Sequence, residues 1–307
     1  MELASISSFY TNNETLVQNV LIYALLAFSV QVALRTGIFS LAGVGFYAIG
    51  SYTAALLVKK GWSTVEAMAA TMLLTILLSY LLAVLLVRLR DLYLAMATFA
   101  FDLMVGVVAA NWNQVTGGPL GVTGIPLAIS TLAIFLTVVV AAILLTSMQG
   151  GILGRTTVTI REDEELAQSF AVNTRNYRHF AFVVSCVLGA FAGAYHALLF
   201  GVIEASDAGF PLIVLVLTMV IIGGYGSWFG ALLGAFLLTW LPLRLTSFGS
   251  WWPVIYGALM IVIATWAPGG IVGLARSLLR RRGGGGPRMR NPLPGRRESV
   301  EVMREAA

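Results

Sequence analysis

The segment "GRTTVTIREDEELAQSFAVNTRNYRH", residues 154–179, carries eight charged side chains. The stretches on both sides of it are almost free of charge. Within residues 92–149 only Asp102 is charged, and within residues 180–242 only Glu204 and Asp207 are. Charged side chains are costly at the centre of a lipid bilayer, whereas long apolar runs are stable there. The contrast indicates a membrane protein that carries a polar segment between two of its spans.

The composition agrees with a membrane location. Apolar residues make up 58% of the 307 residues and charged residues only 11%, whereas a soluble domain is typically about one quarter charged. We therefore predict an all-α integral membrane protein, a polytopic bundle of about eight or nine transmembrane or re-entrant helices, since a span needs roughly 20 apolar residues. The candidate spans are residues 16–34, 36–58, 63–87, 91–111, 127–149, 179–201, 210–223, 227–245 and 250–267.

Two of these candidates are irregular. The segment 36–58 contains four glycines and could be a broken or re-entrant helix, and the segment 210–223 is short and runs into "GGYGS". Non-helical backbone at membrane depth is tolerated only where protein or a water-filled cavity covers it. Both segments are therefore candidates for lining a path or for close helix packing. Glycine pairs four residues apart, at 189/193 and 226/230/234, also predict close packing of helices, within this chain or against a second subunit.

The basic residues predict the orientation of the chain. Nine of the 19 basic residues, all Arg, lie from Arg276 onward, and four more Arg lie in the central segment. Basic loops favour the cytoplasmic side, so the N-terminus is expected outside and the C-terminus inside. Lys59 and Lys60 oppose this assignment, and the N-terminus would move inside if residues 36–58 did not cross. The tail should attract anionic lipid, and it has no aromatic residues to stack on nucleic-acid bases.

Motifs for bond chemistry are absent from the sequence. The chain has no HExxH, no GxSxG, no phosphate-binding Gly-x4-Gly-Lys-Ser/Thr loop and a single cysteine. We therefore expect no metal and no cofactor bound by this chain. His196 is interpreted as a buried hydrogen-bonding residue rather than a proton relay. Asp102 is interpreted as buried and hydrogen-bonded, with Thr98 on the preceding turn as a candidate partner, or else as part of a solute path.

The central segment predicts an amphipathic helix. Read as a helix over residues 160–171, it places Leu166, Ala167 and Phe170 on one stripe and the acidic residues on the remaining face. Apolar anchors at this spacing are typical of a helix that docks into a partner's groove, with charges that fix its register. An ordinary solvated loop is the alternative.

Several stretches together resemble the LivM-type permeases of branched-chain amino acid ABC importers. The resemblance covers about residues 20–275 and is carried by six stretches in the order and spacing of that family. They are "GIFSLAGVGFYAIGSYTAALL" (37–57), "RLRDLYLAMATFAFD" (88–102), "TGGPLGVTGIP" (116–126), "GRTTVTIREDEELAQSFAVN" (154–173), "AFVVSCVLGAFAGA" (181–194) and "VIIGGYGSWFGALLGA" (220–235).

The resemblance implies a domain plan and a set of partners. Residues 1–275 would form the permease domain with a coupling loop at 150–179. Residues 276–307 are expected from their basic charge, and not from the resemblance, to form a disordered cytoplasmic tail. The chain would lie in the bacterial inner membrane beside a second homologous permease chain, two cytoplasmic ABC ATPases that bind ATP and Mg²⁺, and an extracytoplasmic solute-binding protein. Coupling to the ATPases would use Gly154, Arg155, Arg161, Glu162, Asp163, Glu164, Leu166, Ala167 and Phe170.

A solute path is expected where glycines lie beside hydroxyl groups in an apolar setting. The candidate path residues are Gly43, Gly45, Tyr47, Tyr52, Thr98, Asp102, Thr116, Gly117, Gly118 and Thr123. Helix packing alone is the alternative explanation for the glycines. The solute itself stays open, since related permeases also serve urea, short amides and other small solutes. A stand-alone secondary transporter or channel is the rival class, and a membrane enzyme is disfavoured by the missing catalytic motifs.

Overall fold

The computed structural model describes residues 14–86, 89, 91–127, 129–170 and 172–245, and isolated residues between 251 and 274. Two compact units are distinguished, Met1–Gly273 and Leu274–Ala307. The expected basic tail at 276–307 lies outside the described residues, and so does most of the ninth candidate span. The fold below is that of the first unit.

Helices dominate the described part of the chain, which confirms the all-α polytopic prediction. Five helices are long and apolar enough to cross a membrane. They are α2 (Glu14–Arg35), α4 (Thr64–Leu86), α5 (Asp91–Asn111), α7 (Thr131–Gln149) and α10 (Thr174–Phe200). Three shorter apolar helices accompany them: α3 (Gly43–Lys59), α11 (Phe210–Gly223) and α12 (Trp228–Leu245). Each of these eight helices coincides with an expected span to within about five residues at either end, except that α3 begins seven residues after the start of its span.

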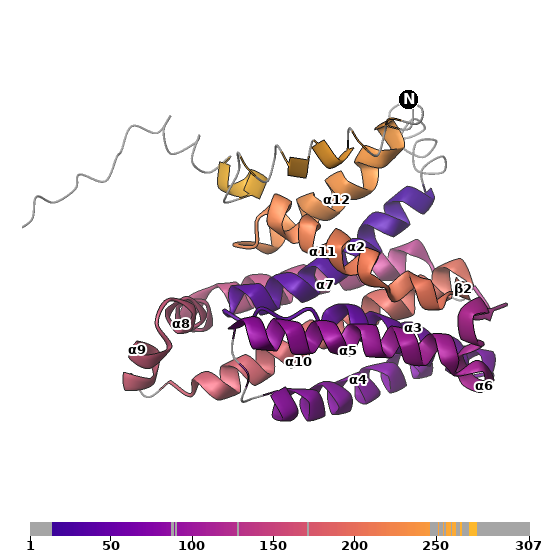
Figure 1. The fold of residues 1–307 in the computed structure, drawn as a ribbon, viewed down its shortest axis with the longest axis horizontal. Coiled ribbons are helices and arrows are strands. Elements are labelled where there is room, and N and C mark those ends of the chain that lie inside the picture. Colours follow the sequence, from indigo (N-terminus) through magenta and orange to yellow (C-terminus); the bar gives the residue numbers. More distant parts are fainter. Residues whose placement is uncertain are drawn as a thin grey trace, which may run out of the picture. The chain divides into compact units, whose positions relative to one another are not determined.

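The short elements gather at the two ends of the helices (Figure 1). One end, here the α8 end, holds α8 (Gly151–Glu162), α9 (Glu164–Ser169) and the connection from α11 to α12. The other end, here the β end, holds α6 (Asn113–Thr116), the 3-10 turns η1 (Gly118–Leu120) and η2 (Ala205–Ala208), and the strands β1 (Val122–Thr123) and β2 (Val202–Ile203). The two strands pair antiparallel, Val122 opposite Ile203.

The glycine-rich segment 36–58 runs from one end of the bundle to the other. Its non-helical start lies at the α8 end, because a Cβ on Gly37 would lie 3.4 Å from Cα of Arg161. Helix α3 then begins at Gly43 and ends at Lys59, whose ammonium donates a hydrogen bond of 3.1 Å to the carbonyl of Thr123 at the β end. The segment therefore runs the length of the bundle, with a short non-helical stretch before its helix, and does not turn back on itself.

Helix α4 shows how the bundle meets lipid. Its exposed stripe is apolar, with Leu73, Leu77 and Leu85 each about two-thirds exposed or more, whereas Thr71 and Thr75 on the inner stripe are buried. Both threonine hydroxyls donate to the carbonyl four residues earlier, so no buried hydroxyl is left without a partner on this stripe. A surface of leucine over an interior of small residues is stable in a bilayer and unstable in water.

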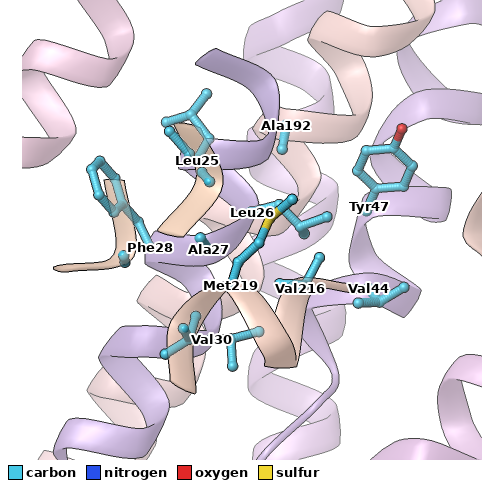
Figure 2. Packing of buried hydrophobic residues seen from close by; sticks show 14 of the residues in the cluster. Leu25, Leu26, Ala27, Phe28, Val30, Val44, Tyr47, Ala192, Val216 and Met219 are labelled. Atoms are coloured by element: carbon cyan, nitrogen blue, oxygen red, sulfur yellow. The ribbon is translucent and has the colours of Figure 1, made fainter. Parts of the chain in front are cut away.

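Helices α3 and α10 run parallel and touch backbone to backbone. A Cβ on Gly189 would collide with the carbonyl of Gly43, and a Cβ on Gly193 would collide with the carbonyl of Tyr47 one turn further along. The glycine pair predicted as a packing motif therefore packs within this chain. Around this contact, side chains of α2, α3, α10 and α11 form one apolar cluster, with Leu26 fully buried at its centre (Figure 2).

Helix α5 supplies the polar groups that satisfy the start of α3. The first N–H groups of a helix lack partners within the helix, and α3 has no side-chain cap of its own. The carboxylate of Asp102, only 1% exposed, accepts a hydrogen bond of 2.8 Å from the N–H of Gly45. The hydroxyl of Thr98 accepts from the N–H of Leu41 at 3.1 Å. Asp102 is thus buried and bonded as expected, but its partner is Gly45 and not Thr98.

We predict that Gly189→Ala destabilises the chain, because the added methyl group meets rigid backbone. Overpacking of this kind typically costs about 1–3 kcal/mol. The matched control is Gly106→Ala in α5, where a Cβ would meet nothing within 4 Å and where alanine gains up to about 1 kcal/mol of helix propensity. Thermal unfolding in detergent measures both. Equal midpoints for the two variants would contradict the close contact.

We predict that Asp102→Asn folds and transports tolerably, because the amide oxygen can still accept from Gly45. Asp102→Leu should lose yield, since an unpaired buried N–H costs about 1–3 kcal/mol. Yield after purification and uptake by cells measure the two effects. Normal yield for the leucine variant combined with abolished uptake for the asparagine variant would assign Asp102 to the solute path instead.

Candidate functional site

The central polar segment folds as two helices and not as the single helix expected over 160–171. Asp163 has extended backbone, with φ −154° and ψ 103°, and separates α8 from α9. Its N–H bonds to the carbonyl of Thr159 and closes α8, and its own carbonyl accepts from Ala167 and opens α9. Asp is among the residues preferred just before a helix, which explains why the helical pattern breaks here.

The apolar residues predicted to dock into a partner do not lie on one common face: Ala167 points into its own chain and Phe170 points outward. Ala167 is fully buried in this chain, whereas Phe170 is 72% exposed just after α9. The amide of Gln168 donates to the hydroxyl of Thr174 at the start of α10, which holds α9 against its own chain. Ala167 therefore packs inward and is unavailable to a partner, contrary to the prediction. The side chains of Glu162, Glu164 and Leu166 lie outside the described residues.

Arg161, predicted to contact the rim of a partner's groove, contacts its own chain in this structure, and its role toward a partner stays a prediction. Its guanidinium donates a hydrogen bond of 2.8 Å to the hydroxyl of Tyr225 and lies 4.7 Å from the centre of the same ring. Tyr225 belongs to the "GGYGS" connection between α11 and α12. Because Arg161 is at the C-terminal end of α8, this pair joins the central segment to the α11–α12 connection.

Further polar contacts fix the same connection to α2 and α7. The amide of Gln31, fully buried, donates to the carbonyl of Tyr225 at 3.1 Å. The guanidinium of Arg35 donates to the carbonyl of Gly226 at 2.9 Å and to that of Gln149 at 3.4 Å. These residues were missed as functional candidates, although Arg35 was recognised as a charge at a span end. We call Gln31, Arg35, Arg161 and Tyr225 the Tyr225 junction.

A cavity of about 480 Å³ opens beside this junction. Two residues predicted for coupling, Gly154 and Arg155, line it. Gly154 has no room for a side chain, because a Cβ there would collide with the carbonyl of Gln149 at the end of α7. The absence of a side chain at Gly154 is thus what lets α8 turn back closely on α7.

The residues predicted for a solute path fall into three separate groups. Gly43, Gly45, Thr98 and Asp102 meet at the start of α3, where packing and hydrogen bonding account for them. A Cβ on Gly43 would collide with the Ser29 side chain, so the glycine is closed off on that side. The contacts of Gly43 and Gly45 agree with the alternative explanation, in which these glycines serve helix packing. A role of these residues in the solute path stays a prediction.

Tyr47 and Tyr52 form the second group, further along α3. Tyr47 is 3% exposed and its ring centre lies 5.7 Å from that of His196 on α10. Tyr52 is 8% exposed, and its hydroxyl has no hydrogen-bond partner in the described part of the chain.

The third group lies in the loop at the β end. The hydroxyl of Thr116 bonds to the carbonyls of Ala109 and Trp112, and Thr123 pairs with β2. Gly117 and Gly118 both have positive φ, +75° and +65°, a conformation that glycine adopts without strain. This group closes the end of the helices and is separated from Gly43 by the length of α3.

Comparison with known proteins shows where this architecture belongs. The family model described as "Branched-chain amino acid transport system / permease component" matches residues 13–264. Two curated relatives are the high-affinity branched-chain amino acid transport system permease proteins LivM of Escherichia coli (strain K12) and Salmonella typhimurium (strain LT2). Each is 28% identical over 302 residues, which covers 86% of this chain and 71% of the relative. No solved structure matches significantly. The chain is therefore a multi-pass inner-membrane protein and belongs to the family of permease components of branched-chain amino acid transport systems.

Proposed function

We propose that this chain is one transmembrane subunit of an ATP-driven importer that carries branched-chain amino acids across the inner membrane. The observation that carries the proposal is the family match over residues 13–264, which spans the whole helical bundle and the polar segment at its α8 end. A second permease chain, two ABC ATPases and an extracytoplasmic binding protein would complete the assembly. ATP hydrolysis would take place in the partner chains.

The charge distribution supports a cytoplasmic α8 end. Arg35, Arg155 and Arg161 lie there, with Arg175 and Arg178 at the start of α10, whereas Lys59 and Lys60 lie at the β end. An excess of basic residues favours the cytoplasmic side. The ATPases would then meet α8 and α9, the binding protein would meet the β end, and the C-terminal tail would be cytoplasmic.

Coupling would begin at Phe170. A large aromatic side chain that is 72% exposed within a charged segment suits the apolar groove of a partner, because buried aromatic anchors dominate interface energies. A movement of α8 and α9 driven by the ATPases would pull on Tyr225 through Arg161. The α11–α12 connection would thereby move with the ATPases.

A stand-alone secondary transporter or channel remains the rival class. Oδ1 of Asp102, the acid deep within a span, accepts a hydrogen bond from the start of α3, whereas its Oδ2 has no partner among the described residues. Proton- or ion-coupled carriers typically use several intramembrane charges, and Asp102 is the only Asp, Glu, Lys or Arg within residues 92–149. The importer is tested by reconstituting the chain with its neighbouring permease, ATPases and binding protein in liposomes. Leucine uptake that requires ATP and all four components supports the importer, and uptake by this chain without ATPases would establish the rival. Uptake of urea or short amides but not of leucine would leave the importer class in place and correct only the proposed substrate.

Phe170→Ala should uncouple ATP hydrolysis from uptake, because loss of a central anchor can cost about 2 kcal/mol or more. The control is Phe135→Ala on α7, a phenylalanine 51% exposed on the lipid-facing side. ATPase stimulation and uptake are measured together in liposomes. Wild-type coupling in the Phe170 variant would exclude it as an anchor. Ala167→Asp is a poor probe, since a buried charge at that position would disrupt α9 itself.

Tyr225→Phe should weaken coupling less than Phe170→Ala does, because the ring remains while the hydrogen bond from Arg161 is lost. A hydrogen bond at a part-exposed site contributes roughly 1 kcal/mol. Tyr80→Phe on the lipid-facing side of α4 loses a hydroxyl at a 58% exposed position and serves as the control. The ratio of leucine imported to ATP hydrolysed is the measurement. An unchanged ratio in the Tyr225 variant would mean that the junction does not transmit the movement.

A further inference from the structure

The cavity at the α8 end has a positively charged lining. Its volume is about 480 Å³, and three helices contribute to its wall. Arg35 comes from α2, Gln149 from the end of α7, and Arg155, Val158 and Thr159 from α8. Among the described residues that line it, two are Arg and none is Asp or Glu. A concave surface that carries charge of one sign attracts ligands of the opposite sign, so this cavity suits an anion.

Arg155 is placed to contact such an anion. Gly151, Arg155 and Val158 lie on one face of α8, because residues four and three positions apart share a helix face. All three are exposed and all three line the cavity. The guanidinium of Arg155 forms no hydrogen bond or ion pair with a residue that the structure describes. Guanidinium groups bind phosphate oxygens through two parallel hydrogen bonds, so Arg155 can bind a phosphate group directly.

Arg35 is held in place at the same cavity. Its guanidinium donates to the carbonyl of Gly226 at 2.9 Å and to that of Gln149 at 3.4 Å. These bonds fix the charged group where α2, the end of α7 and the α11–α12 connection meet. A side chain that is already ordered loses little freedom when a ligand binds. The positive charge of Arg35 is therefore in position before an anion arrives.

An exposed apolar stripe on α7 leads to the cavity. Leu136, Val140, Ile143 and Leu144 share one face of the helix and are 54–62% exposed. Helix α7 ends at Gln149, which lines the cavity, so Ile143 lies roughly 9 Å before it along the helix axis. In a membrane protein this stripe faces acyl chains. A lipid whose chain lies against the stripe has its phosphate at the depth of the cavity.

We propose that Arg35 and Arg155 bind the phosphate of an anionic phospholipid whose acyl chain lies along α7. The inference goes beyond the proposed function and requires no particular solute. A headgroup with net negative charge, such as that of phosphatidylglycerol, is preferred to phosphatidylethanolamine, because two guanidinium groups repel the ammonium of the latter. Since Arg35 also belongs to the Tyr225 junction, the bound lipid lies beside the contact between α8 and the α11–α12 connection.

Arg155→Gln tests the site. Native mass spectrometry of the full chain in detergent, titrated with phosphatidylglycerol, measures the dissociation constant of the first bound lipid. We expect it to rise about three- to tenfold, because the charge-assisted hydrogen bonds to phosphate are lost. Arg175→Gln is the matched control, since it removes one exposed charge at the start of α10 and does not line the cavity. The basic tail is the same in all variants, so its general attraction for anionic lipid does not affect the comparison.

Two further probes distinguish a lipid from a free anion. Phosphatidylethanolamine should bind severalfold more weakly than phosphatidylglycerol, and inorganic phosphate at equal concentration should not displace the lipid. Displacement by inorganic phosphate would make the cavity a site for soluble anions and overturn the lipid assignment. Equal weakening in the Arg155 and Arg175 variants would reduce the effect to general charge attraction and overturn the site. Unchanged lipid binding in the Arg155 variant would also overturn it, and a loss of ATPase coupling in that variant would assign Arg155 to the coupling contact instead.

Discussion

The hydrogen bond from Gly45 N–H to the Asp102 carboxylate is the interaction on which the arrangement of the bundle depends. Lipid offers no hydrogen bonds, so a helix that begins among other spans must have its first N–H groups satisfied by protein. Helix α3 starts in this way, after a non-helical stretch that ends at Ala42, and α5 supplies both acceptors, Asp102 and Thr98. This buried acid thereby fixes where α3 begins and so which of its residues reach the β end.

Once α3 begins there, glycine contacts determine what lies beside it. The close approach at Gly189 and Gly193 holds α10 parallel to α3 with almost no side chain between their backbones. Tyr47 and His196 then meet at 5.7 Å because they lie on neighbouring turns of the two helices. The glycines that predicted either helix packing or a solute path thus allow close packing at Gly43. About one turn further along α3, the same close approach brings Tyr47 next to His196.

The sequence predicted the helices well and the contacts of charged residues poorly. Apolar runs define spans because length and hydropathy act locally, and eight of the nine candidates were recovered. The single helix over 160–171 was wrong because Asp163 has an extended conformation that periodicity cannot reveal. The contact of Arg161 with Tyr225 was not predicted, because the two residues lie 64 positions apart in the sequence. Thr98 was predicted as the partner of Asp102 because the two residues lie one turn apart on the same helix. The observed partner is the N–H of Gly45 on another helix, because lipid cannot satisfy the free N–H groups at the start of α3.

Helix α11 joins the two ends of the bundle. It begins directly after η2, which carries Asp207, and ends at the connection that carries Tyr225. With 14 residues at a rise of about 1.5 Å each, it is a strut of roughly 20 Å. A short helix with one buried face shifts as a unit, because packed interiors transmit displacement instead of absorbing it. A pull on Tyr225 by Arg161 at the α8 end would therefore reach η2 at the opposite end without passing through the α3–α10 pair. In such an arrangement the coupling segment would move η2 at the β end, while the close backbone contact between α3 and α10 stays in place.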